Sequence, residues 1–142
     1  MRALLDVNVL LALFQPDHAH YELAQQWWAA HQSSGWASCP LTQNGFVRIV
    51  SQGRYPKPMA LRAAIEWIAE QIATTDHAFW PDDISLLDSM SFNRDRIHGP
   101  KQLTDIYLLG LAVKNGGRLV TLDQTIPLAA VRGANEGHLV VL

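Results

Sequence analysis

Three aspartates stand at the borders of apolar segments, where their carboxylates could be gathered into one site. Asp6 and Asp123 each follow a short apolar run, and Asp105 opens a strongly apolar segment. Carboxylates brought together by folding repel one another unless a cation balances them. Hard cations such as Mg²⁺ or Mn²⁺ prefer oxygen ligands. Because no Gly-x-Ser-x-Gly elbow offers a protein nucleophile, the chemistry that these residues favour is metal-assisted hydrolysis by water.

Strand and helix patterns alternate along the chain, and they place the aspartates at one edge of a sheet. The expected strands are Ala3–Leu5, Trp36–Ser38, His77–Trp80, Arg118–Leu122 and His138–Leu142. The expected helices are Val7–Phe14, Tyr21–Gln32, one opening at Pro40 with Thr42 as its cap, Met59–Thr74, Ile84–Phe92 after an Asp82-Asp83 start, and Ile106–Lys114 opened by Thr104-Asp105. Near-continuous apolar strands alternating with helices predict an α/β fold, a three-layer α/β/α sandwich with a central, mainly parallel sheet. Ligands bind such sheets beyond the carboxyl ends of the strands.

The composition bounds the class of protein. With 142 residues and 49% hydrophobic content, the chain suits a single domain over residues 1–142. Its formal net charge of -2 argues against nucleic-acid binding through a large overall positive field. The lone cysteine, Cys39, excludes an internal disulfide, and no apolar run approaches the roughly 20 residues of a membrane span. We therefore expect a soluble, cytoplasmic protein.

Each aspartate also has a purely structural interpretation. Aspartate is common in the turns that follow strands, and a Thr-Asp pair at a helix start often serves only as a cap. Any one of the three is therefore a weak signal by itself. Caps and solvated charges also account for three further aspartates, which are left out of the predicted site: Asp82, Asp83 and Asp88.

Three sequence blocks together resemble the PIN domain family. Leu4–Leu13 resembles the Asp-x-Asn opening of PIN domains, at the end of their first strand. Leu103–Ala112 resembles their central Thr-Asp helix, and Leu119–Asp123 their Thr-x-Asp strand end. The order and spacing of the blocks cover nearly the whole chain. The resemblance implies a PIN-like fold and divalent-metal-dependent hydrolysis of RNA.

A fourth block is similar to the VapC branch of that family, the toxins of bacterial toxin-antitoxin pairs. In Pro40–Ile49, the position directly after the Thr usually holds a catalytic glutamate in that branch, whereas this chain has Gln43. Glutamine keeps a carbonyl oxygen but loses a negative charge and cannot accept a proton as a base. The resemblance further implies a VapB-like antitoxin and a homodimer as partners. Of the adjacent Trp27 and Trp28, one is expected to face such a partner.

The predicted catalytic residues are the three aspartates with Gln43, and the aspartates are the predicted metal ligands for Mg²⁺ or Mn²⁺. The missing carboxylate at position 43 favours one tightly bound ion over two. Two neighbouring polar residues, Asn8 and Thr121, are expected to hold the carboxylates in register.

Cations should surround an anionic site that holds RNA. Arg48 follows Gln43 on the same predicted helix, and the other candidates precede Asp105 in an irregular stretch: Arg94, Arg96, His98 and Lys101. Contact with phosphate is the functional interpretation of these side chains. The alternative is ordinary surface charge, which soluble domains carry in both signs.

Two other functions compete with the ribonuclease. The first is a PIN-like module that binds RNA or protein and whose catalysis Gln43 has weakened; activity gained in Gln43→Glu would argue against it. The second is a phosphoacceptor signalling domain, which also places aspartates at strand ends. The chain resembles that class poorly, because no acidic pair follows the first strand and no mid-chain aspartate closes a strand.

Overall fold

A five-stranded parallel sheet forms the centre of the molecule in the computed structural model, which describes residues 1–142. The strands lie in the order β3-β2-β1-β4-β5, and every neighbouring pair is parallel. Their bounds are β1 Ala3–Leu5, β2 Trp36–Ser38, β3 His77–Phe79, β4 Arg118–Thr121 and β5 Leu139–Val141. All five predicted strands are present.

Five α-helices connect and cover the strands. Their bounds are α1 Val7–Phe14, α2 Tyr21–His31, α3 Pro40–Val50, α4 Leu61–Thr74 and α5 Leu103–Lys114. Short 3-10 turns lie between them, two of which, η2 (Arg94–Arg96) and η3 (Pro100–Gln102), shape the irregular stretch before α5. None of the helices combines the length and the apolar character needed to cross a membrane.

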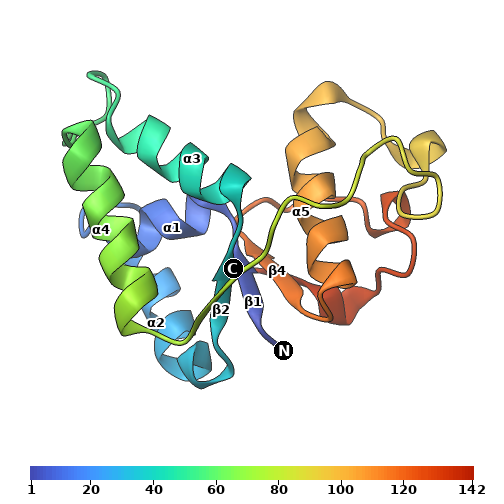
Figure 1. The fold of residues 1–142 in the computed structure, drawn as a ribbon, viewed down its shortest axis with the longest axis horizontal. Coiled ribbons are helices and arrows are strands. Elements are labelled where there is room, and N and C mark those ends of the chain that lie inside the picture. Colours follow the sequence, from blue (N-terminus) through green and yellow to red (C-terminus); the bar gives the residue numbers. More distant parts are fainter.

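Helices cover both faces of the sheet, as Figure 1 shows. α1 to α4 pack on one face, and α5 packs on the other together with the segments that follow β3 and β4. Successive side chains of a strand enter different cores, so that Leu4 faces α5 while Ala3 and Leu5 face the opposite layer. The predicted α/β/α sandwich is therefore confirmed.

The carboxyl ends of the central strands are level with one another. Leu4 pairs with Ala37 of β2, and Leu5 pairs with Val120 of β4. This register brings the end of β1, where Asp6 begins α1, beside the ends of its two neighbours. Neighbouring strands are about 4.8 Å apart, so side chains at these ends are within reach of one another.

The helix expected over Ile84–Phe92 was wrong, and the segment is a series of turns. Ser85 and Asp88 bond backbone amides two residues ahead, at 3.1 Å to Leu87 and 2.9 Å to Met90. Such local bonds compete with the hydrogen bonds of a helix. The helical apolar pattern also fails, because Leu87 and Met90 are 85% and 82% exposed.

Three predicted helix starts also need correction. Cys39 is the N-cap residue of α3, and Thr42 lies one turn inside, where its hydroxyl accepts a 3.0 Å hydrogen bond from the Cys39 amide. Asp82 and Asp83 cap no helix, and Asp83 forms a 2.5 Å ion pair with Lys114 of α5. α5 itself begins at Leu103, earlier than expected, so Asp105 lies in its first turn.

Candidate active site

Asp6 is a buried carboxylate at the point where β1 becomes α1. It is the N-cap of α1 and is 5% exposed. One carboxylate oxygen accepts a 2.7 Å hydrogen bond from the Val7 amide, and the other accepts a 2.7 Å bond from the Thr121 hydroxyl. Burial raises the pKa of Asp6, the two hydrogen bonds oppose that rise, and the charge of Asp123 adds to it.

Thr121 and Asn8 join the ends of β1 and β4. The fully buried Thr121 hydroxyl, which donates to Asp6, accepts hydrogen bonds from the Asp123 amide at 3.0 Å and from the Asn8 side chain at 3.3 Å. The Asn8 carbonyl oxygen in turn accepts a 3.2 Å bond from the Leu122 amide. Every one of these bonds spans the two strand ends or fixes the turn after β4. The two residues predicted to hold the carboxylates are thus in contact with the site.

Asp105 and Asp123 complete a group of three neighbouring carboxyl groups. Burial raises the pKa of Asp105 from 3.8 to about 7, and a hydrogen bond from its protonated form to Asp123 and the charges of Asp6 and Asp123 contribute further. Asp123 behaves in the opposite way. The side-chain and backbone hydrogen bonds from Thr125, at 2.7 and 2.8 Å, lower its pKa, and the bond from Asp105 adds to this.

No positively charged side chain balances these carboxylates. The four ion pairs of the molecule lie elsewhere, on Asp76, Asp17, Glu66 and Asp83. The side chains as they stand do not surround a common point in the way that ligands surround a bound metal ion. Asp6 is turned toward Thr121 and Asp123 toward Thr125. The donor set itself, three carboxylates without a cation, fits a hard divalent ion.

Gln43 belongs to a second polar group beside the three aspartates. Its amide nitrogen donates a 2.9 Å hydrogen bond to the Ser38 hydroxyl at the end of β2. Ser38 is fully buried and also lies 2.7 Å from Nε2 of His77, in β3. No hydrogen bond joins the Gln43 side chain to the three aspartates.

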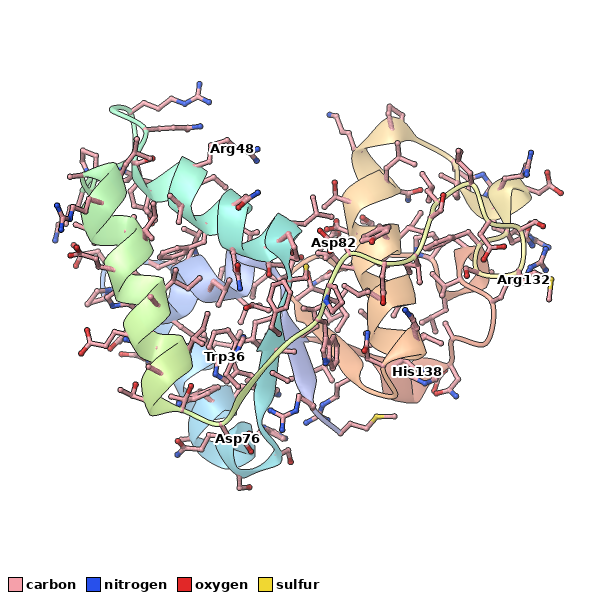
Figure 2. All side chains as sticks on the ribbon, viewed as in Figure 1. Trp36, Arg48, Asp76, Asp82, Arg132 and His138 are labelled. Carbon is pink, nitrogen blue, oxygen red and sulfur yellow. The ribbon has the colours of Figure 1, made fainter.

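The cations predicted to contact RNA all lie on the surface. Arg48, Arg94, Arg96 and Lys101 are exposed, and none takes part in an ion pair. Arg48 projects from α3 on the side that faces the layer of α5, as Figure 2 shows. The other three lie in η2 and η3, which lead into the helix that carries Asp105.

Four polar residues near the site were not predicted as part of it: Ser38, His77, Asp82 and Thr125. Ser38 ends a strand at the same edge as Asp6, which is a signal that the sequence did contain. Asp82 was assigned to a helix cap, yet it lies beside Cys39 and Tyr107, between β2 and α5. Burial of Tyr107, followed by the charge of Asp82, raises the pKa of Tyr107. Burial also raises the pKa of the Cys39 thiol to about 11, so this thiol stays protonated.

Known proteins resemble this chain in sequence over most of its length. The sequence pattern of the PIN domain matches residues 3–132. Ribonuclease VapC44 of Mycobacterium tuberculosis is 54% identical over 142 residues, which is 100% of both chains. Ribonuclease VapC39 of the same organism is 41% identical over 137 residues, 96% of this chain and 99% of that protein. Ribonuclease VapC38 is 40% identical over 122 residues, 85% of this chain and 84% of that protein.

The matched residues 3–132 include the sequence blocks that resemble PIN domains, together with the three aspartates. The expectation from the sequence blocks is therefore confirmed: this chain belongs to the PIN domain family, in its VapC branch.

Proposed function

We propose that this protein is a divalent-metal-dependent endoribonuclease whose metal ligands are Asp6, Asp105 and Asp123. The observation that carries the proposal is the meeting of three carboxyl groups without a cation. Burial, together with the two neighbouring carboxyl groups, raises the pKa of Asp105 to about 7. A partly buried group of like charges is expected where a bound cation supplies the missing positive charge. Mg²⁺ or Mn²⁺ suits these oxygen ligands best.

A bound divalent ion would supply a water of lowered pKa and would neutralise charge on the scissile phosphate. The protein's part is to hold the ligands in place. Thr121 and the Val7 amide keep the Asp6 carboxylate fixed between β1 and β4. Asn8 fixes the turn that carries Asp123, through its bonds to Thr121 and to the Leu122 amide.

Asp105 and Asp123 differ in proton affinity, so the proton of the pair resides on Asp105. Asp123 accepts two hydrogen bonds from Thr125 and stays ionised, whereas Asp105 holds its proton up to about pH 7. Loading with a cation requires Asp105 to release that proton. Asp105 is therefore the ligand whose state decides whether the site is ready to bind metal at neutral pH.

The substrate must be attracted to a site of negative charge. Arg48, Arg94, Arg96 and Lys101 are the exposed cations proposed to contact the RNA backbone. They lie on α3, which carries Gln43, and on the stretch that leads into α5, which carries Asp105. Such contacts position RNA without reading its sequence.

The biological setting follows from the relatives, which are named ribonucleases of the VapC group. We propose that the chain is the toxin of a toxin-antitoxin pair, with a VapB-like antitoxin as its partner. A homodimer and a cytoplasmic location belong to the same proposal, as does a single domain over residues 1–142.

Of the two adjacent tryptophans, Trp28 is the one available to a partner. Trp28 is half-buried and lines a cavity of about 230 Å³ between α2 and α4, whereas Trp27 is only 9% exposed.

Cleavage of total RNA tests the proposal. The protein should cut RNA with Mg²⁺ or Mn²⁺ and should stop when EDTA is added. Asp6→Asn should lose at least about 100-fold in rate, because it removes a charged ligand while keeping the side-chain shape. Cleavage that survives EDTA, or full activity in Asp6→Asn, would overturn the mechanism. Metal binding without any cleavage would instead identify the weakened binding module.

A further inference from the structure

A chain of hydrogen bonds runs from Gln43 through Ser38, at the carboxyl end of β2, to His77 in β3. Gln43 lies in the first turn of α3, Ser38 ends β2, and His77 begins β3. β2 is the neighbour of β1, whose end carries Asp6. Ser38 is therefore about one strand spacing from the end of β1, which carries Asp6, and His77 is about two.

When the Gln43 amide nitrogen faces Ser38, the direction of both bonds follows from the number of protons available. The Gln43 amide nitrogen is a donor only, so the Ser38 oxygen accepts from it at 2.9 Å. Ser38 is fully buried and keeps one proton of its own to donate. His77 Nε2, at 2.7 Å, is the acceptor for that proton when the ring is neutral and carries its proton on Nδ1.

The opposite arrangement is also self-consistent, and it reverses the amide. If His77 donated from Nε2, the Ser38 hydroxyl would be free to donate to Gln43, which would then turn its carbonyl oxygen toward the sheet. The amide nitrogen would point away from Ser38. Whether Nε2 of His77 carries a proton thus decides which end of the Gln43 carboxamide points outward.

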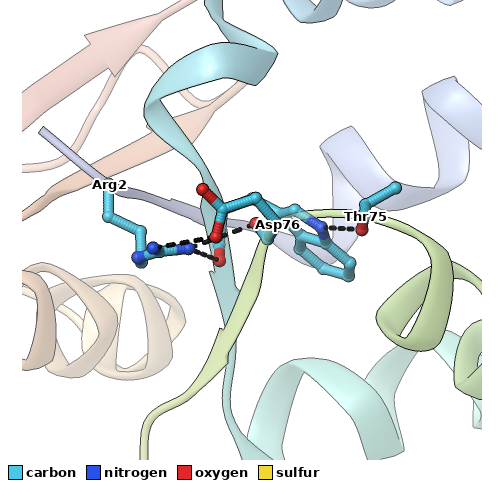
Figure 3. Close-up of polar contacts among 4 residues, drawn as sticks. Arg2, Thr75 and Asp76 are labelled. Carbon is cyan, nitrogen blue, oxygen red and sulfur yellow. Dashed lines mark hydrogen bonds and ion pairs between the residues drawn. The ribbon is translucent and has the colours of Figure 1, made fainter.

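The surroundings of His77 favour the neutral ring. Its pKa is lowered by burial and by the nearby positive charge of Arg2. Arg2 is held in place by a 3.0 Å ion pair with Asp76 and by a 3.1 Å hydrogen bond to the Trp36 carbonyl oxygen, as Figure 3 shows. The Trp36 ring packs edge-on against His77, with centroids 4.5 Å apart.

Trp36 is itself held from the other side. Its ring nitrogen donates a 2.7 Å hydrogen bond to the Thr75 hydroxyl, also drawn in Figure 3. Thr75 in turn donates to the Gln71 carbonyl oxygen of α4 at 2.6 Å. Neither bond reaches Ser38 or Gln43. Thr75 is therefore bonded to Trp36 but takes no part in the hydrogen bonds that hold the Gln43 amide.

We propose that Ser38 and His77 are positioning residues that hold the Gln43 carboxamide with its nitrogen toward the sheet and its carbonyl oxygen outward, as a neutral acceptor beside the three aspartates. This inference rests on the proposed ribonuclease function. A carbonyl oxygen can accept a hydrogen bond from a water, whereas an outward NH₂ group could only donate. An outward NH₂ group would thus lose the one property through which a glutamine can assist a cation site.

Steady-state kinetics on an RNA oligonucleotide with saturating Mn²⁺ test this chain of hydrogen bonds in three variants. Ser38→Ala and Gln43→Ala should each lower kcat by about 10-fold with little change in KM, because groups that orient the surroundings of a metal site typically contribute 10- to 100-fold. Since Ser38 acts through Gln43, the double variant should be no slower than Gln43→Ala alone. Additive losses would overturn the proposal.

Two further variants separate positioning from folding. Ser38→Thr keeps the hydroxyl and should restore most of the kcat, whereas Thr75→Val removes a hydrogen bond of the same layer and should leave kcat unchanged. His77→Phe keeps the ring against Trp36 but removes the acceptor, so it should resemble Ser38→Ala. An equal loss in Thr75→Val would assign the effect to general destabilisation and would contradict the proposal.

A spectroscopic readout tests the amide direction without any catalysis. Nitrogen-15 NMR of the intact protein at pH 8 should show His77 protonated on Nδ1 and unprotonated on Nε2. A ring protonated on Nε2 would reverse the chain of donors and sink the inference. If the wild-type protein cuts no RNA under any metal, the proposed function fails, while this measurement still decides the orientation of the network.

Discussion

The Thr121 hydroxyl donates a 2.7 Å hydrogen bond to the Asp6 carboxylate and so joins the ends of two parallel strands. The two residues are separated by 115 positions in the chain, and both are buried. The same hydroxyl accepts from the Asp123 amide. One side chain therefore controls the position of two of the three proposed ligands.

Replacement of Thr121 by valine should disturb the site while keeping the shape of the side chain. The Asp6 carboxylate would lose a donor in a buried place, which costs about 1 to 3 kcal/mol of stability. Mn²⁺ affinity should fall about 10-fold or more, as is usual for groups that orient metal ligands. Calorimetric titration and chemical denaturation measure the two effects. Thr121→Ser, which keeps the hydroxyl, should behave like the wild type, and an equal loss in both variants would contradict this role.

The pKa of Asp105 makes the stability of the metal-free protein depend on pH. The unfolded chain releases this proton near 3.8, whereas the folded chain holds it up to about pH 7. Between these values the folded state binds more protons, so the free energy of unfolding should fall as pH rises and should level off above 7. The expected size is about 1 to 2 kcal/mol, allowing for screening of this half-buried group.

Thermal unfolding in EDTA at pH 5 and at pH 8 measures this dependence. Asp105→Asn cannot ionise, so the difference between the two pH values should shrink, and the variant should be the more stable protein at pH 8. Asp6 also has a raised pKa and remains in the variant, which is why the comparison with the wild type is needed. An unchanged pH dependence in Asp105→Asn would show that Asp105 ionises normally.

Close packing of α3 on α1 should matter for the site, because Val7 directly follows Asp6. A Cβ atom at Gly45 would lie 2.7 Å from a methyl group of Val7. Gly45→Ala gains up to about 1 kcal/mol of helix propensity, but overpacking typically costs about 1 to 3 kcal/mol. We expect a net loss of stability, partly restored by Val7→Ala, measured by urea denaturation. Gly53, which has no neighbour near its Cβ position, is the control; a Gly45→Ala variant as stable as Gly53→Ala would refute the contact.

The exposed arginines before α5 should make RNA binding sensitive to salt. Replacing Arg94 and Arg96 by alanine removes two phosphate contacts, so the slope of log affinity against log salt should become shallower by about 1.4 for single-stranded RNA. Fluorescence anisotropy in EDTA measures binding without cleavage. Arg62→Ala is the matched control, because Arg62 pairs with Glu66 on the outer face of α4. An equal change of slope in the control would mean that the arginines act only through net charge.

Much of the site was predictable from the sequence because it depends on strand ends. Asp6 and Asp123 follow apolar segments that form neighbouring parallel strands, and parallel strands end at one edge of a sheet. Asp105 was predictable as a first-turn residue of an apolar helix. What brings these three together is topology, and topology follows from the alternation of strand and helix.

Side-chain direction was not predictable in the same way. That Gln43 bonds Ser38 and not the aspartates depends on rotamers and on the register of β2 with β1. The segment before η2 shows a second limit. Its apolar residues suggested a helix, but the side chains of Ser85 and Asp88 form hydrogen bonds with nearby backbone amides. A pattern of hydrophobicity does not reveal this local competition with the helix.

The central claim is that three distant aspartates bind one divalent cation, and calorimetric titration of Mn²⁺ at pH 7 tests it most directly. The wild-type protein should bind Mn²⁺ and release protons as Asp105 ionises, which appears as a dependence of the measured heat on the buffer. Asp6→Asn, Asp105→Asn and Asp123→Asn should each weaken binding by more than about 10-fold. Mn²⁺ binding of equal affinity in the wild type and in all three variants would contradict the account.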